Sequence, residues 1–325
     1  MLLRIACLAG LLLFPLTCLK AQPPAEWWQV EQFVRMQPPI QNSKDLKLLT
    51  LAVNHRFADT LSRLKAVYVW LTANMAYDEK DSRGKNINID SALKYKTAIC
   101  AGYTNLFEQL CEGIGVKAIE IPGYGSSTVH AIPQSEKFTV NHAWNAVWLG
   151  GRWQLIDATW ASGYTQEGEQ TFIKRRNDWY FLTDPEKMIR DHYPKQSAWQ
   201  LLKDTLSWEA FKLLPVFSLG AQEDSITAYG PSGDTIYAKQ GDVIHFWFNT
   251  RKRLNKIIFK SKEKNISVVA DLTSTTSGYS YDFKVPHTGI YDLSIILTDF
   301  TLQTVQPGKQ YGFLIDFMYR LNIKR

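Results

Sequence analysis

The pattern that most restricts the fold of this chain lies in residues 141–160. Apolar and polar side chains alternate there on both sides of the pair Gly150-Gly151. Alternation around two adjacent glycines is typical of a β-hairpin with a two-residue loop. In such a hairpin Leu149 pairs with Arg152, and this pairing fixes the register of every residue behind it.

The predicted register brings two chemically active side chains together. Asp157 lies opposite Trp144, and His142 lies on the same face of the sheet, because side chains two positions apart point to the same side. His142 and Asp157 are then diagonal neighbours, about 7–8 Å apart at the backbone, which their side chains can bridge. A carboxylate in this place fixes the tautomer of an imidazole and stabilises its protonated form.

A third candidate, Cys100, lies near the start of a predicted helix. Residues 97–113 have apolar side chains at helical spacing, and Gly113 suits the end of the helix. The pKa of a thiol falls at a helix N-terminus or beside an imidazolium, so Cys100 is placed to act as a nucleophile. Cys111 continues the apolar stripe. It lies about 16 Å along the helix from Cys100, beyond the Cα separation of about 7 Å that a disulfide spans.

The character of the sequence changes near residue 220. Before it, residues 61–75 have the spacing of an amphipathic helix, and residues 116–121 read as a short strand. After it, glycine and proline turns separate short β-rich runs, which predicts a β-sandwich. These runs are residues 243–248, 256–259, 266–269, 279–285 and 291–297. We therefore predict one domain over residues 22–219 and a smaller all-β domain over 220–325.

Residues 1–21 have the pattern of a secretory signal peptide. A positive charge precedes a short apolar run, and the small residue Ala21 follows. We expect cleavage after Ala21 and export to the periplasm, the cell surface or the medium; lipidation of Cys18 is the alternative. The mature chain has no segment long enough to span a membrane.

Charge and histidine spacing exclude other classes of function. The 325 residues include 37 Lys and Arg against 31 Asp and Glu, a formal charge of +6 that is spread along the chain. This distribution does not indicate a nucleic-acid partner. We predict no metal and no other cofactor, because no spacing resembles a metal site. The histidines without a partner pattern are His55, His192, His245 and His287.

Three motifs in the same order resemble those of the transglutaminase-like superfamily, specifically its kyphoscoliosis-peptidase-like bacterial branch. They are ICAGY at 99–103, NHAWN at 141–145 and DATW at 157–160, within a similarity over roughly residues 60–215. The resemblance implies a papain-like α+β core, here followed by an immunoglobulin-like sandwich. It also implies a triad with Cys100 as nucleophile, His142 as general base and acid, and Asp157 as the orienting acid.

The chemistry implied by this family is acyl transfer through a thioester. We expect a peptidase or amide hydrolase that acts on a protein, a peptide or a cell-envelope polymer. Deamidation and protein cross-linking differ only in the amide attacked and in the second nucleophile. A non-catalytic binding or assembly module is the alternative from another class. The oxyanion would be bound by the backbone N–H of Cys100 and by a side chain from residues 74–77.

Overall fold

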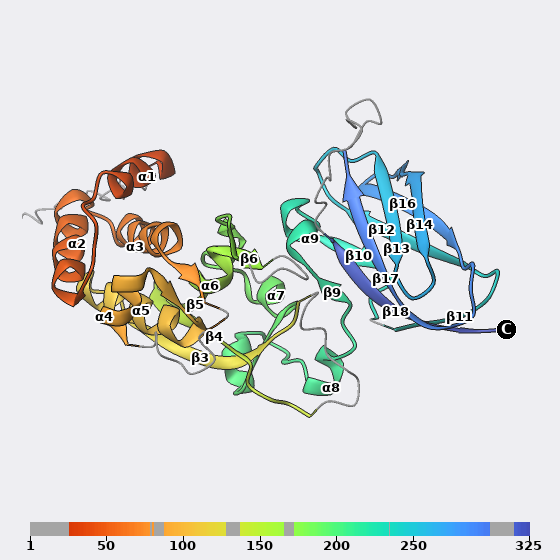
Figure 1. Ribbon diagram of the computed structural model, residues 1–325, viewed down its shortest axis with the longest axis horizontal. Coiled ribbons are helices and arrows are strands. Elements are labelled where there is room, and N and C mark those ends of the chain that lie inside the picture. Colours follow the sequence, from red (N-terminus) through yellow and green to blue (C-terminus); the bar gives the residue numbers. More distant parts are fainter. Residues whose placement is uncertain are drawn as a thin grey trace, which may run out of the picture.

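The computed structural model describes residues 26–78, 80, 88–127, 137–165, 172–233, 235–299 and 315–325. The predicted signal segment, residues 1–21, lies outside the described residues. Figure 1 shows helices gathered at the N-terminal end of the molecule and β-sheets at the C-terminal end, with the green segment between them. Within the described ranges, no helix is long and apolar enough to cross a bilayer.

Five helices precede or flank the first sheet. Their bounds are α1 Trp27–Arg35, α2 Ser43–Arg56, α3 Thr60–Asn74, α4 Ile89–Tyr95 and α5 Cys100–Gly113. Side chains of Asn42, Asp59 and Asn88 accept backbone N–H groups at the starts of α2, α3 and α4, which satisfies donors that a helix leaves free. The helix predicted over residues 61–75 is confirmed. The one predicted over 97–113 begins three residues later, because residues 97–98 form a strand.

The first sheet contains the predicted hairpin. Its strand order is β5-β4-β3-β8, with bounds β3 Ala118–Gly125, β4 His142–Leu149, β5 Arg152–Ile156 and β8 His192–Pro194. Leu149 pairs with Arg152 as predicted, and Gly150 and Gly151 have φ of +62° and +78°, values that favour glycine. Strand β3 runs to Gly125, further than the predicted 116–121. Together with the helices, this sheet confirms the α+β class.

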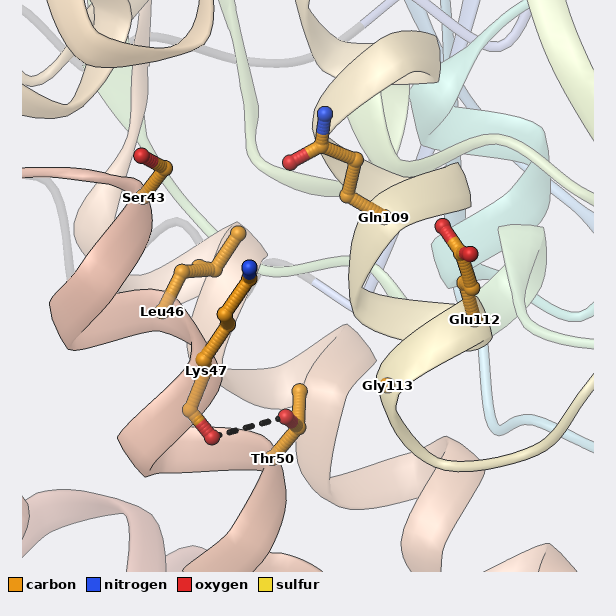
Figure 2. A pocket seen from close by; sticks show the side chains of 7 residues that line it. All are labelled: Ser43, Leu46, Lys47, Thr50, Gln109, Glu112 and Gly113. Atoms are coloured by element: carbon orange, nitrogen blue, oxygen red, sulfur yellow. Dashed lines mark hydrogen bonds between the residues drawn. The ribbon is translucent and has the colours of Figure 1, made fainter.

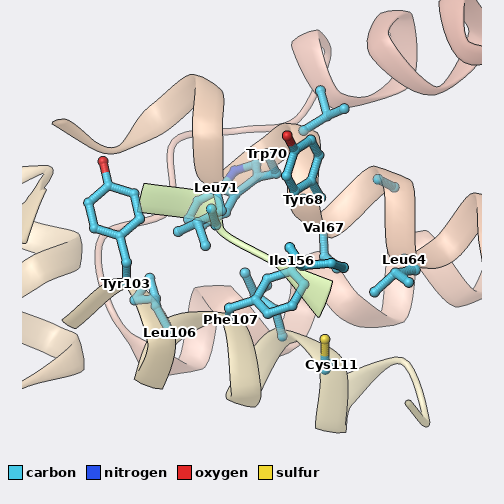
Figure 3. Close-up of a cluster of buried hydrophobic side chains, with 14 of the residues drawn as sticks. Leu64, Val67, Tyr68, Trp70, Leu71, Tyr103, Leu106, Phe107, Cys111 and Ile156 are labelled. Carbon is cyan, nitrogen blue, oxygen red and sulfur yellow. The ribbon is translucent and has the colours of Figure 1, made fainter. Parts of the chain in front are cut away.

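The core of the first part lies between α3, α5 and the hairpin (Figure 3). Trp70 and Leu71 of α3 pack there with Leu106 and Phe107 of α5. Cys111 belongs to this core and is fully buried. Both Cys100 and Cys111 are free thiols, as predicted from their separation along one helix.

The C-terminal part consists of two facing β-sheets. One has the order β10-β12-β16-β15, and the other β11-β18-β17-β13-β14 with β9 beside β18. Their inner faces meet through aromatic rings: Phe246 packs on Phe259, and Phe248 on Phe317. The strand bounds are β9 Val216–Phe217, β10 Ala228–Gly230, β11 Thr235–Lys239, β12 Val243–Asn249, β13 Lys256–Ser261, β14 Ile266–Asp271, β15 Thr273–Ser274, β16 Gly278–Lys284, β17 Gly289–Thr298 and β18 Phe317–Lys324.

These sheets confirm the all-β class of the C-terminal part. Each of the five β-rich runs predicted from the sequence lies within or overlaps a strand, from β12 to β17. The core here, centred on Phe246, Phe259 and Tyr319, is separate from that of the helical part. The boundary between residues 219 and 220 stays a prediction.

Short elements fill the segment between the two cores. They are α6 Ala158–Ala161, β6 Gly163–Thr165, β7 Phe172–Lys174, α7 Pro185–Met188, α8 Trp208–Phe211 and α9 Leu219–Glu223, with 3-10 turns at Asp178–Tyr180 and Ser197–Gln200. Trp179 packs against both cores. Arg190 donates to the carbonyls of Ile226 and Thr227. The two parts of the chain therefore meet through side chains as well as through the connecting backbone.

A groove of about 410 Å³ lies between α2 and the end of α5 (Figure 2). It is lined by Ser43, Leu46, Lys47, Thr50, Gln109, Glu112 and Gly113. The two helices approach closely there, since a Cβ on Gly113 would lie 2.6 Å from the Thr50 side chain. Cys100 is at the opposite end of α5, so this groove is separate from the candidate nucleophile.

Candidate active site

Cys100 is the first residue of α5 and is partly exposed. Burial raises the pKa of its thiol, but a hydrogen bond and the charge of His142, together with the backbone N–H of Ala101, lower that pKa below its ordinary value. The N-terminal end of a helix carries partial positive charge, which also favours a thiolate. The site therefore favours the reactive form of this cysteine.

His142 begins β4 and faces Asp157. The distance between His142 Nε2 and Asp157 Oδ2 is 2.6 Å, and the imidazole is almost fully buried between the indoles of Trp144 and Trp160. Burial lowers the pKa of His142, but Asp157 and Cys100 raise it to about 10. Because Nε2 is engaged by Asp157, Nδ1 is the nitrogen available to the thiol.

Asp157 caps the short helix α6 and closes the hairpin. Its Oδ1 accepts the backbone N–H groups of Thr159 at 2.7 Å and Trp160 at 3.0 Å. Burial raises the pKa of this carboxyl, but His142 and His192 hold it below its ordinary value. Strand β5 ends one residue earlier, at Ile156. The predicted pairing of Asp157 with Trp144 is therefore absent, and helix capping, beyond the last ladder pair, directs the carboxylate toward His142.

The three residues chosen from the sequence thus meet in one site. They come from the start of a helix, the start of a strand and the turn after the next strand. Residues 51–158, which include all three, match the transglutaminase-like superfamily. The chain carries a domain of this superfamily.

Curated proteins with related sequences match about half of this chain. Kyphoscoliosis peptidase of Mus musculus is 36% identical over 155 residues, and that of Homo sapiens 37% over 157; each match covers 47% of this chain and 23% of the relative. Hillarin of Drosophila melanogaster is 28% identical over 177 residues, 49% of this chain and 21% of hillarin. The chain therefore spans about a quarter of the length of these relatives.

A second histidine contacts the same carboxylate in the transglutaminase-like domain. His192 Nε2 lies 2.9 Å from Asp157 Oδ2, because β8 pairs with β3 and places His192 opposite Gly125. The expectation from the sequence, that His192 has no partner pattern, was therefore wrong. The contact joins His192 of β8 to the residue that caps α6, so the hairpin register does not predict it. The neighbouring Asp191 is a local indication.

The cluster of His142, Asp157 and His192 also has the composition of a metal site. One ligand atom from each lies within 4.8 Å of the others. These same atoms are joined directly by hydrogen bonds of 2.6 and 2.9 Å through a single carboxylate oxygen. A cation at this place would have to replace both bonds, so the geometry suits proton and charge stabilisation.

The candidates for binding an oxyanion lie on either side of a short parallel ladder. The N–H of Cys100, in the first turn of α5, is one of the donors that a helix leaves without an internal partner. Strand β1 (Ala76–Tyr77) pairs with β2 (Thr97–Ala98), which leads directly to Cys100. The Asn74 amide donates to the carbonyl of Trp70 in its own helix, and Tyr77 pairs with Ala98, two residues before Cys100.

Proposed function

We propose that this chain is a cysteine enzyme that cleaves amide bonds, as a peptidase or amide hydrolase, with Cys100, His142 and Asp157 as its catalytic triad. The observation that carries the proposal is the buried 2.6 Å contact of His142 with Asp157 beside a thiol of lowered pKa. A thiolate is the form of cysteine that attacks a carbonyl. Fold alone supports several activities, so this arrangement of side chains is what supports this one.

The proposed reaction has two acyl-transfer steps. The Cys100 thiolate attacks the amide carbon, and the C–N bond breaks as protonated His142 gives a proton to the leaving nitrogen. Neutral His142 then removes a proton from water, which attacks the thioester and releases the acid, and the thiolate–imidazolium pair is restored. Asp157 holds the imidazole throughout. A backbone donor at the oxyanion contributes on the order of 3 kcal/mol, a role for the N–H of Cys100.

The proposal includes export and an extracytoplasmic substrate. Residues 1–21 support export through their charge and apolar run. We propose a protein, a peptide or a cell-envelope polymer as the substrate. Full-length chain expressed in a Gram-negative host and recovered outside the cytoplasm should begin at Gln22, as N-terminal sequencing would show. Recovery with an intact leader, or with a lipid on Cys18, would contradict cleavage after Ala21.

Thiol labelling tests the nucleophile without knowledge of the substrate. Iodoacetamide at pH 6, with the modified residue identified by mass spectrometry, should alkylate Cys100 at least tenfold faster than free cysteine. Cys111 is the internal control, because burial raises its pKa well above the ordinary value. Cys111→Ala should keep the labelling and Cys100→Ala should lose it. Labelling of Cys100 no faster than free cysteine would contradict the proposal.

Product analysis then separates the alternatives. Wild type and Cys100→Ala are incubated with an envelope proteome in the presence of a labelled primary amine. New N-termini, or glutamines converted to glutamates, that depend on Cys100 support a hydrolase, whereas released ammonia alone does not separate hydrolysis from amine transfer. Incorporation of the amine into glutamine side chains would contradict hydrolysis in favour of cross-linking. Identical products from both variants would contradict an enzyme and favour a binding module.

A further inference from the structure

The hydrogen bonds of the triad continue into the protein beyond Asp157. His192 Nε2 contacts Asp157 Oδ2 at 2.9 Å, and His192 Nδ1 contacts Asp191 Oδ1 at 2.5 Å. The other oxygen of Asp191 accepts the Tyr180 hydroxyl at 2.8 Å. His192 and both carboxylates are at most 1% exposed. Acid and base thus alternate along a buried path from the nucleophile.

The path ends on a residue at the start of the C-terminal part. Gln222 of α9 donates its two amide hydrogens to the Tyr180 hydroxyl at 2.5 Å and to Asp191 Oδ2 at 3.0 Å. Its oxygen accepts the side-chain amide of Asn177 at 2.6 Å. The preceding residue, Ala221, belongs to the core of the C-terminal sheets. One short helix therefore contributes to the sandwich core and to the hydrogen bonds behind the triad.

His192 must carry both ring protons to satisfy its two neighbours. Each ring nitrogen faces a carboxylate oxygen, and only the doubly protonated imidazole donates to both. Burial lowers the pKa of His192, but Asp191 and Asp157 raise it above its ordinary value. The groups that face this ring are Asp157, Asp191, His142, Tyr180, Trp144 and Trp160.

Four donors hold the orientation of the Asp157 carboxylate. Oδ1 accepts two backbone N–H groups and Oδ2 accepts His142 and His192. Loss of the His192 donor leaves a buried carboxylate under-satisfied, which is costly. The carboxylate then turns toward other donors, and His142 loses the fixed partner that keeps it charged beside Cys100.

We propose that His192 is a positioning residue for the His142–Asp157 pair, and that Asp191, Tyr180 and Gln222 tie this position to the docking of the C-terminal β-sheets. This inference rests on the proposed function, because it assigns how the same site is held. The all-β part then serves as a brace for the triad. Removal or displacement of the all-β part lowers the reactivity of Cys100, although the all-β part contributes no residue to the triad.

The first test follows Cys100 alkylation by iodoacetamide against pH in the full chain. In His192→Leu the midpoint of the profile should rise by about one unit, which lowers the rate about tenfold at a pH below both midpoints, because each unit of pKa is a factor of ten in thiolate there. His192→Gln places an amide N–H near the position of Nε2 and should recover most of the rate. His245→Gln, at an exposed histidine that pairs with Asp282, is the control and should match wild type.

The second test addresses the tie to the C-terminal part and does not require His192→Leu to fold. Gln222→Met keeps the length of the side chain and removes its hydrogen bonds; the alkylation rate at pH 6 should fall at least threefold. Gln200→Met is the matched control, since Gln200 is also buried but bonds only locally, to Leu206. Equal profiles for Gln222→Met and Gln200→Met would overturn the coupling.

The outcomes separate this inference from the proposed function. Fast labelling of wild-type Cys100 with unchanged profiles in folded His192→Leu and His192→Gln overturns the positioning role and leaves the triad intact. Labelling of the wild type no faster than free cysteine overturns both. Recovery in His192→Gln but not in His192→Leu supports positioning through the Asp157 contact, which a loss of general stability would not reproduce.

Discussion

His142 Nε2 and Asp157 Oδ2 lie 2.6 Å apart at the open end of the hairpin formed by β4 and β5. Pairing of β4 with β5 places the strand that begins at His142, and the cap of α6 holds Asp157. The contact keeps the imidazole protonated and leaves Nδ1 for the thiol.

Asp157→Asn should lower Cys100 reactivity strongly. The amide removes the negative charge that raises the pKa of His142, so that pKa should fall from about 10 toward 6.5. An Asn can also donate to Nε2 and select the wrong tautomer, an effect of roughly 10⁴ in rate in a Ser-His-Asp triad. The alkylation rate at pH 6 measures the reactivity of Cys100, and NMR titration measures the pKa of His142. Asp282→Asn, beside exposed His245, is the control; a pKa of His142 that stays near 10 in Asp157→Asn would contradict the assignment.

Gly125→Ala should disturb the site through direct contact. A Cβ at this position would lie 2.7 Å from Trp160 Cζ2 and 3.2 Å from His142 Cδ2. One of the two rings must move, so alkylation of Cys100 should slow at least tenfold, with about 1–3 kcal/mol lost from the free energy of unfolding. Gly233→Ala is the control, because its nearest neighbour would be 3.9 Å away. Wild-type reactivity in Gly125→Ala would show that the rings accommodate the methyl group.

Cys100→Ala should make the stability of the protein more dependent on pH. In the wild type, between the ordinary pKa values of 6.5 for His and 9.0 for Cys, the unfolded pair holds one proton on sulfur and the folded ion pair holds one on His142. In the wild type, the Cys100–His142 pair therefore adds no pH dependence to the free energy of unfolding over this range. Without the thiol, the folded state still protonates His142 through Asp157 while the unfolded state does not.

The sign follows from this difference in bound protons. When folding raises the pKa of His142, the resulting stabilisation is complete below pH 6.5. It is lost as the pH rises through the folded-state pKa. Relative to wild type, the free energy of unfolding of Cys100→Ala should fall by up to about 1.4 kcal/mol per pH unit above pH 6.5. Urea denaturation at pH 6.5, 7.5 and 8.5 measures it. Parallel pH dependence in the two proteins would contradict the ion pair.

Lys65 should stabilise the fold mainly through its aliphatic stem. Its side chain is 2% exposed, Nζ contacts Asp178 Oδ2 at 2.9 Å, and the ammonium lies 4.2 Å from the ring centroid of Phe181. Burial lowers the pKa of this amine, partly offset by Asp178. Lys65→Met keeps the volume and should cost at most about 1 kcal/mol, whereas Lys65→Ala should cost about 2–4 kcal/mol. Equal urea midpoints for the two variants would contradict a packing role.

Sequence patterns predicted helices and strands well where these depend on residues that are close together along the chain. The glycine pair fixed the hairpin register, because a two-residue loop admits one pairing of Leu149 with Arg152. Glycine and proline turns between β-rich runs also located strands β12, β13, β14, β16 and β17 of the C-terminal sheets. Parity along the hairpin puts Trp148 on the face that carries His142 and predicts a buried side chain, but Trp148 is 46% exposed. Which residues of a strand face are covered depends on packing between distant elements.

By itself, the sequence determined the three side chains of the candidate site, since each stands in a motif and the predicted hairpin register brings two of them close. Tertiary structure alone decided that His192 would contact Asp157 and that Gln222 would close the path behind it. Pairing of β8 with β3 and docking of α9 set those contacts. Such contacts depend on the folded arrangement of separate segments, and no periodicity along the chain encodes them.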